Sequence, residues 1–184
     1  NGTTLFVSIA AGTTIARLEA ALGARTPIVR AMPNTPAAIG RGITALVGNS
    51  HADEAALSLA ETLMAAVGRT VRLTEEAQMD AVTAVSGSGP AYVFLLIEAL
   101  SAAGEAEGLP AALALDLARA TVAGAGALAE ASDNPPSTLR TEVTSPAGTT
   151  AAALEVLMDE TTGLPPLMRR GVSAAASRSR ALAG

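Results

Sequence analysis

The chain has 184 residues and a formal net charge of −5, with hydrophobic residues at 49% of positions but aromatic residues at only 2%. This length predicts one large domain or two small ones, and so much aliphatic surface excludes a disordered chain. A site for single-stranded nucleic acid needs aromatic side chains in a basic groove, so the composition also argues against a nucleic-acid partner.

The ionisable residues narrow the chemistry further. All twelve basic residues are Arg, the chain has no Cys, and His51 is its single histidine. Lysine Schiff-base chemistry, thiolate nucleophiles, disulfides and zinc-type metal clusters are therefore excluded from this segment. We assign no metal site, and we give His51 no catalytic role because it lies beside Asp53 and Glu54, as a solvated loop residue would.

The longest apolar run covers residues 91–97 and is closed by Glu98. It is far shorter than the roughly 20 residues that span a bilayer, so we expect no membrane segment. The absence of cysteine fits a cytoplasmic protein. The sequence opens at Asn1 with neither a methionine nor a basic leader and enters a β-like run at once, from which we expect that an upstream part is missing.

The first 73 residues predict strands that alternate with helices. Strands are expected at residues 5–10, 27–31, 43–47 and 70–73, and helices at 14–22 and from the N-cap Asp53 to residue 67. This alternation is typical of one half of a doubly wound α/β sheet with parallel strands. Two prolines at residues 32–36 predict an extended loop after the second strand.

From Thr74 onward the pattern is helical. Thr74 is the expected N-cap of the first helix, and further helices are expected at residues 90–107, 110–131, 136–143, 147–158 and 166–182, most of them beginning at or near a proline. The small residues of 111–131 favour close packing between helices or between subunits. We place the boundary between Leu73 and Thr74, so that an α/β domain covers residues 1–73 and an all-α domain covers residues 74–184.

The strongest candidate site is the segment SPAGTT at residues 145–150. Ser145 as N-cap and Pro146 at the first helical position would start a helix whose next amides have no carbonyl partner. Such an end binds a carboxylate or a phosphate. A well-capped helix without a ligand explains the same residues, but two threonines at 149 and 150 are poorer helix formers than Ala, which favours a ligand site.

Three further segments are candidates. The SGSGP segment at residues 86–90 interrupts a helical stretch with two glycines, which predicts a kink that either forms the floor of a pocket or lets two helices pack. MPNTP at residues 32–36 and IAAG at residues 9–12 each follow a predicted strand, where open α/β sheets bind ligands, although ordinary turns are the alternative for both.

Three longer stretches carry a resemblance to a known family: VRAMPNTPA at 29–37, AVTAVSGSGPAY at 81–92 and EVTSPAGTTAAALEVL at 142–157. In this order and spacing they are similar to the pyrroline-5-carboxylate reductase family. The resemblance implies the C-terminal half of a Rossmann-type parallel sheet followed by an all-helical dimerisation domain. It also implies hydride transfer from NADPH or NADH to the C=N bond of a cyclic imine carboxylate, giving proline. A protonated imine is already electrophilic, so this chemistry requires no Lys, Cys or His.

The resemblance assigns the site residues as well. Gly148, Thr149 and Thr150 would bind the substrate carboxylate, with Thr150 as the catalytic donor near the imine nitrogen. Further substrate-binding residues would be Ser145, Asp133, Ser86 and Ser88, and the nicotinamide half of the cofactor would contact Ile9, Ala10, Ala11, Met32, Pro33 and Asn34.

Two departures from the family pattern are visible. The family commonly has glycine where this chain has Ala147, and the glycine-rich phosphate loop of the family is absent from these 184 residues. Without that loop the dinucleotide would bind poorly, and the preference for NADPH or NADH cannot be read. A truncated, non-catalytic dimerisation module is therefore the alternative to a reductase. A related β-hydroxyacid enzyme is excluded because it needs a catalytic Lys. In either reading we expect an obligate homodimer or a larger ring of dimers.

Overall fold

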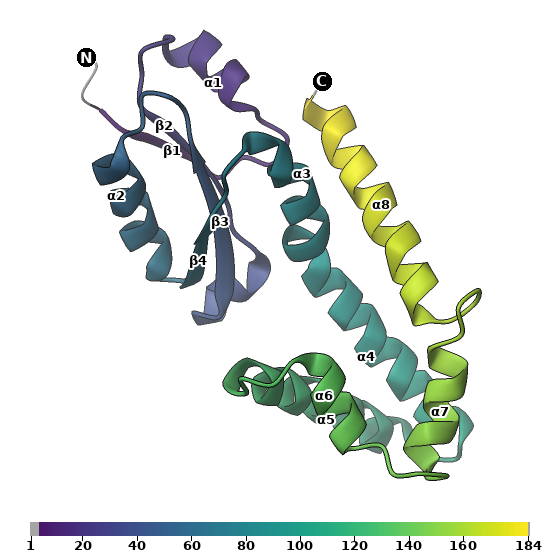
Figure 1. Cartoon of the computed structure of the whole chain (residues 1–184). Coiled ribbons are helices and arrows are strands. Elements are labelled where there is room, and N and C mark those ends of the chain that lie inside the picture. Colours follow the sequence, from purple (N-terminus) through teal and green to yellow (C-terminus); the bar gives the residue numbers. More distant parts are fainter. Residues whose placement is uncertain (1–3, 184) are drawn as a thin grey trace. The chain divides into compact units, whose positions relative to one another are not determined.

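The computed structural model describes residues 4–183 and contains a four-stranded sheet (Figure 1). The strands are β1 (Phe6–Ser8), β2 (Ile28–Met32), β3 (Gly42–Gly48) and β4 (Gly68–Arg72), in the order β1-β2-β3-β4. All four coincide with predicted strands, and their ends differ from the prediction by one or two residues. Helices α1 (Ile15–Leu22) and α2 (Glu54–Ala65) follow β1 and β3 in the chain, as expected.

The sheet is mixed, so the α/β class is confirmed but the prediction of parallel strands throughout is wrong. β1 pairs with β2 and β3 with β4 in parallel, whereas β2 and β3 are antiparallel, with Met32 opposite Ala45. Only residues 33–41 join β2 to β3, and a parallel crossover needs a dozen or more residues. This connection was expected to be extended, but it contains the 3-10 helix η1 (Thr35–Ile39), because the fixed φ of Pro36 suits the first turn of a helix.

Apolar residues cover both faces of the sheet, which explains why its central strands are mostly apolar and buried. One core cluster consists of Val29, Ala31, Leu46 and Ala60, and the other of Ala45, Val47 and Met79. Ala60 comes from α2 and Met79 from the first helical turns after the sheet, so these two elements lie on opposite faces.

The helix starts show which N-cap predictions hold. The Asp53 carboxylate accepts a hydrogen bond from Ala56 N at 2.9 Å, which confirms it as the N-cap of α2. Thr74 is not an N-cap: Glu75 caps the short 3-10 helix η2 (Glu76–Gln78) in a capping box with Gln78. The Thr74 hydroxyl donates to Gln78 Oε1 at 3.2 Å instead of capping a helix amide.

After β4 the described chain is helical, as predicted. The elements are α3 (Met79–Val82), the π-helical turn η3 (Thr83–Gly87), α4 (Gly89–Ala106), α5 (Ala111–Ala131), α6 (Pro136–Glu142), α7 (Thr149–Leu157) and α8 (Leu164–Ala183). Contacts divide the chain into two compact units, residues 1–90 with 171–184 and residues 91–170, which we call the sheet unit and the helical unit. Helix α8 thus begins in the helical unit and ends in the sheet unit.

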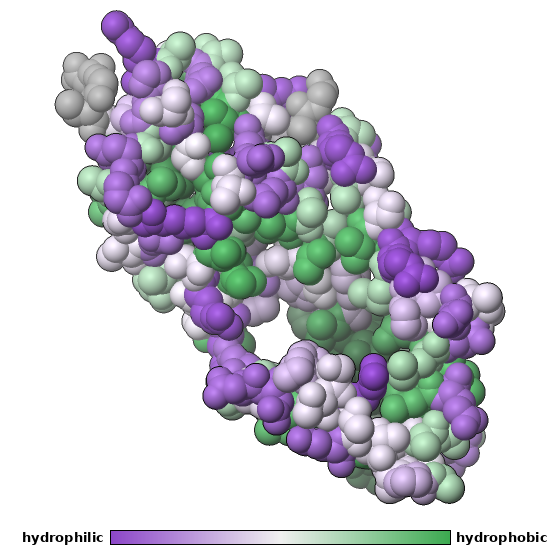
Figure 2. Space-filling model, in the orientation of Figure 1, coloured by the Kyte–Doolittle hydropathy of each residue, from purple (hydrophilic) through white to green (hydrophobic). Residues whose placement is uncertain are grey.

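The helical unit exposes many large hydrophobic residues, and Figure 2 shows green atoms interspersed with white and purple ones on the visible face of the molecule. Its exposed large hydrophobic residues include Phe94, Leu95, Leu117, Leu128, Val156 and Leu167. Two helical stretches, Glu76–Ala106 and Ala111–Ala131, are long and apolar enough to cross a membrane by length and composition, and only 11% of the apolar window of each is buried. Faces of this kind mark an interaction surface.

Candidate functional site

In the sheet unit, Asn34 brings two of the predicted site segments together. Its Nδ2 donates to the Ser86 carbonyl at 3.3 Å and lies 3.5 Å from Ser86 Oγ, while its Oδ1 accepts from Ile43 N at 3.0 Å. A single half-buried side chain therefore fixes the MPNTP loop both to β3 and to the SGSGP segment.

The predicted irregularity at SGSGP is confirmed and takes the form of a π-helical turn. Ser88 N donates to the carbonyl of Thr83, five residues earlier, at 2.8 Å. A Cβ atom at Gly87 would lie only 2.7 Å from Met32 Cε, so glycine allows the methionine to approach the helix closely. Turns of this kind are frequent at functional sites, and this one is packed directly against the MPNTP loop.

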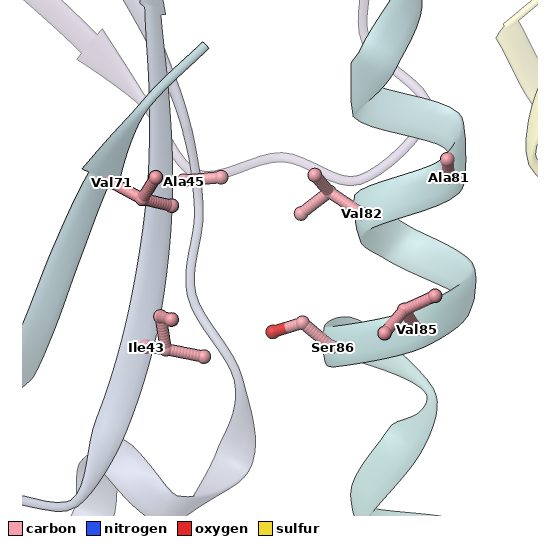
Figure 3. Close-up of a pocket in the computed structure, with 7 residues that line it drawn as sticks. All are labelled: Ile43, Ala45, Val71, Ala81, Val82, Val85 and Ser86. Carbon is pink, nitrogen blue, oxygen red and sulfur yellow. The ribbon is translucent and has the colours of Figure 1, made fainter. Parts of the chain in front are cut away.

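An apolar cavity of about 310 Å³ lies beside this contact, between the sheet and the helical turns that follow it (Figure 3). It is lined by Ile43, Ala45, Val71, Ala81, Val82, Val85 and Ser86. In Figure 3 the strand side chains face those of the helix, and the Ser86 hydroxyl is directed across the gap toward the strand side. This lining suits an apolar group and offers no positive charge for a carboxylate.

The expected cofactor residues lie at one edge of the sheet. Because β1 and β2 are parallel and Ser8 is paired with Arg30, the loops that follow these strands leave the sheet at the same edge. The residues of the first loop, Ile9, Ala10 and Ala11, are exposed, whereas Met32, Pro33 and Asn34 of the second are partly buried. Both loops occupy the position where open α/β sheets bind ligands.

In the helical unit, the SPAGTT segment forms a turn before it forms a helix. Helix α7 begins at Thr149 with Gly148 as N-cap, so the prediction that Ser145 caps the helix and that it starts at Ala147 is wrong. Gly148 N donates to the Ser145 carbonyl at 3.1 Å, and Ala147 has φ of 57°, in the left-handed region. Pro at the second and a positive φ at the third position are typical of a type II turn, which delays the helix by two residues.

The N-terminal end of α7 nevertheless has amides without a partner inside the helix, as the sequence predicted. The first hydrogen bond of the helix runs from Ala152 N to the Gly148 carbonyl at 3.2 Å, so the amides of residues 149–151 have no partner within it. Within residues 4–183 no side chain caps this end. Thr149 is exposed and Thr150 is partly buried, and the positive helix end therefore presents amides and hydroxyls to an anion.

The remaining predicted substrate residues are placed as follows. Ser145 is exposed in the turn that precedes α7, and Asp133 is exposed in the turn between α5 and α6. Ser88 is partly buried at the end of the π-helical turn in the sheet unit. The predicted site residues are thus divided into one group in the sheet unit and one group in the helical unit.

Sequence reasoning missed Arg30, which is buried within VRAMPNTPA. Its Nη1 donates to Glu76 Oε1 at 2.8 Å, and the same oxygen accepts from Ile15 N at 2.8 Å. This contact ties β2 to the start of α1 and to η2, beneath the loop edge. The signal for it was present in the sequence, because a lone Arg in the middle of an apolar strand requires a partner.

A family model described as pyrroline-5-carboxylate reductase dimerisation matches residues 76–182, which is more than half of the chain. The chain belongs to the pyrroline-5-carboxylate reductase family. Two curated relatives with that name come from Pseudomonas aeruginosa, at 47% identity over 179 residues, and from Synechocystis, at 43% over 178 residues. Each comparison covers 97% of this chain but only 65% of the relative, so the chain spans about two thirds of their length.

Solved structures of this family agree with the fold. A pyrroline-5-carboxylate reductase from Coxiella burnetii has a TM-score of 0.93 at 40% identity and covers 98% of this chain and 66% of its own. A pyrroline carboxylate reductase from Plasmodium falciparum, solved with NADP bound, has a TM-score of 0.87 at 32% identity and covers 99% and 72%. The fold class expected from the sequence, half of a Rossmann domain followed by helices, is therefore the fold of the family.

Proposed function

We propose that the protein is a pyrroline-5-carboxylate reductase, which reduces the C=N bond of 1-pyrroline-5-carboxylate to proline. The observation that carries this proposal is the open, uncapped N-terminus of α7 with Thr149 and Thr150, in a chain of this family. Three unpaired amides at a positive helix end bind the carboxylate of a cyclic imine without a basic side chain.

The proposed mechanism depends on placement. The amides of residues 149–151 hold the carboxylate. The Thr150 hydroxyl donates a hydrogen bond to the imine nitrogen while that nitrogen is neutral, and accepts one from its N–H once it is protonated. Because a protonated imine accepts hydride readily, fixing the ring in a reactive orientation accounts for much of the rate. Ser145, Gly148, Asp133, Ser86 and Ser88 are proposed to complete the substrate site.

The residues present fit the nicotinamide half of a dinucleotide. The exposed loop after β1 consists of Ile9 and the two small residues Ala10 and Ala11. The loop of Met32, Pro33 and Asn34 lies at the same edge of the sheet. NADPH or NADH supplies the hydride when bound there. The glycine-rich loop that would hold the pyrophosphate is absent from these 184 residues, so we propose that the remaining third of the family's length supplies it.

We propose further that a second copy of the chain covers the apolar faces of the helical unit. The two longest apolar stretches lie within the part that matches the dimerisation model, which favours a protein partner over a bilayer. Sedimentation should give a dimer or a ring of dimers at micromolar concentration. A folded monomer, or flotation with neutral vesicles, would contradict this assignment.

We also propose a location for the protein and a boundary between its domains. A cytoplasmic location fits a family that acts in amino-acid biosynthesis. A domain boundary between Leu73 and Thr74 is supported by the start of the family's dimerisation model at residue 76.

A test of the function compares Thr150→Ala with Thr150→Ser and with the control Thr141→Ala, in the chain extended to the full length of the family. Among the described residues, the Thr141 hydroxyl donates to the Ser137 carbonyl within α6, at 3.0 Å. Thr150→Ala should lose about tenfold to a hundredfold in kcat/KM for the imine, as expected for one buried hydrogen bond. Thr150→Ser should recover most of the activity, and equal activity of Thr150→Ala and Thr141→Ala would remove the role of Thr150.

The alternative, a non-catalytic dimerisation module, is favoured by the missing phosphate loop. Titration of the 184-residue chain with NADPH and NADH distinguishes the two. A module dimerises but binds neither dinucleotide, even when the missing third is added as a separate polypeptide. A reductase fragment regains dinucleotide binding and imine reduction on that addition.

A further inference from the structure

The last two turns of α8 return to the sheet unit and contact it at three points. We call residues 177–182 the C-terminal clasp. The buried Ser179 hydroxyl donates to Asp80 Oδ1 of α3 at 2.6 Å, although 99 residues separate the two in sequence. Figure 1 shows this end of α8 running beside α3.

The second contact lies under the proposed cofactor loop. Gly12 is buried with φ of 72°, and a Cβ atom there would lie 3.2 Å from Leu182 Cβ and 3.6 Å from the Leu182 carbonyl carbon. The end of α8 therefore packs directly on the glycine that closes the loop. A third, longer contact joins Arg17 Nη1 of α1 to the Leu182 carbonyl at 3.5 Å, where a basic group complements the carboxyl end of a helix.

Among the described residues, the loop itself is held by long hydrogen bonds. Its internal hydrogen bonds, from Ala10 N to Ser8 Oγ and from Thr13 N to the Ala10 carbonyl, are both 3.4 Å long, beyond the usual range of 2.7 to 3.2 Å. Ile9, Ala10 and Ala11 are exposed. Of the four loop residues, Gly12 alone is buried, and it packs against the end of α8.

We infer that the C-terminal clasp positions the loop of residues 9–12 relative to α3, and so sets the affinity of the nicotinamide side of the site. Ser179 and Asp80 are the positioning residues, since their hydrogen bond holds the clasp on the helix that leads to Ser86. The part of this inference that concerns the affinity for the nicotinamide rests on the proposed function. The dependence of the loop on the clasp does not.

The test uses Ser179→Ala in the chain extended to the full length of the family, with Ser177→Ala as the matched control. Ser177 is exposed on the same helix and, within the described part of the chain, accepts a hydrogen bond from Arg180 of the next turn, at 2.9 Å. Ser179→Ala should raise both the Kd and the KM for the dinucleotide about fivefold to tenfold, the effect of one net hydrogen bond, and leave kcat within about twofold. Ser177→Ala should change neither.

A double-mutant cycle and an activity-free readout complete the experiment. Asp80→Ala should reproduce Ser179→Ala, the double variant should lose no more than either, and Asp80→Asn, which still accepts the hydrogen bond, should retain the affinity. Hydrogen exchange at residues 9–13 should accelerate in Ser179→Ala and in a chain ending at Ala181, while α2 stays protected. If loop exchange and dinucleotide affinity match those of Ser177→Ala, the inference is wrong. If the wild type binds no dinucleotide, the proposed function fails, and exchange alone decides the role of the clasp.

Discussion

Replacing Ala147 with glycine should stabilise the protein, because Ala147 is the only non-glycine residue with a positive φ among the residues that the structure describes. The left-handed conformation costs an L-residue roughly 1 to 2 kcal/mol. Glycine in the same conformation bears only its larger loss of backbone entropy on folding, roughly 0.5 to 1 kcal/mol. The net gain is about 0.5 to 1 kcal/mol, which corresponds to a Tm rise of about 1 to 4 °C for a chain of this length.

The control is Ala153→Gly, at an exposed position in the interior of α7. There glycine should lower the free energy of unfolding by about 1 kcal/mol, because the backbone is a right-handed helix and glycine has a lower helix propensity than alanine. Ala147→Val should also destabilise, since a β-branched residue is disfavoured at positive φ. Urea unfolding at one fixed protein concentration measures all three, because the stability of a dimer depends on concentration.

The opposite signs expected for the two Ala→Gly changes make the comparison decisive. If both variants lose stability, the turn before α7 is not left-handed in solution. The argument that this turn delays the helix and leaves its amides open would then be refuted.

Three further predictions concern the sheet unit. Asn34→Asp keeps the acceptor for Ile43 N but cannot donate to the Ser86 carbonyl, so urea unfolding should show a loss of about 1 to 3 kcal/mol, whereas the exposed Asn134→Asp should show little change. Gly87→Ala should displace the flexible end of Met32 and lower the free energy of unfolding by about 1 kcal/mol or less. If calorimetry gives this variant and the wild type the same dinucleotide affinity, the contact between Gly87 and Met32 does not matter to the site. Hydrogen bonds from Arg72 hold the pKa of Glu54 and of Glu61 below the ordinary value of 4.5. Carboxylates with a lowered pKa stabilise the fold above their unfolded pKa and lose this contribution as the pH falls through the folded pKa. The small difference in Tm between wild type and Arg72→Gln should therefore be full at pH 7 and shrink below pH 4.5. A difference in Tm that is independent of pH would contradict the ion pairs.

Local signals in the sequence predicted the four strands and most of the helices, but they missed the 3-10 helix η1. Asp53 before an apolar helical pattern predicted its N-cap correctly, and the glycines of SGSGP correctly predicted a break in helical geometry. They failed where two local rules compete. Ser145 and Thr74 both have good capping side chains, but a proline turn displaced the first and the side chain of Gln78 engaged the second.

The sequence by itself determined the family, the α/β-then-helical order and the exclusion of Lys and Cys chemistry, because these follow from residue types and short spacings. Only the tertiary structure decided that β2 and β3 are antiparallel, that Asn34 joins two site segments, and that Ser179 reaches Asp80 across 99 residues. The physical reason is that strand direction and long-range hydrogen bonds depend on how the chain closes on itself, and no local pattern of side chains records which distant partner a polar group will find.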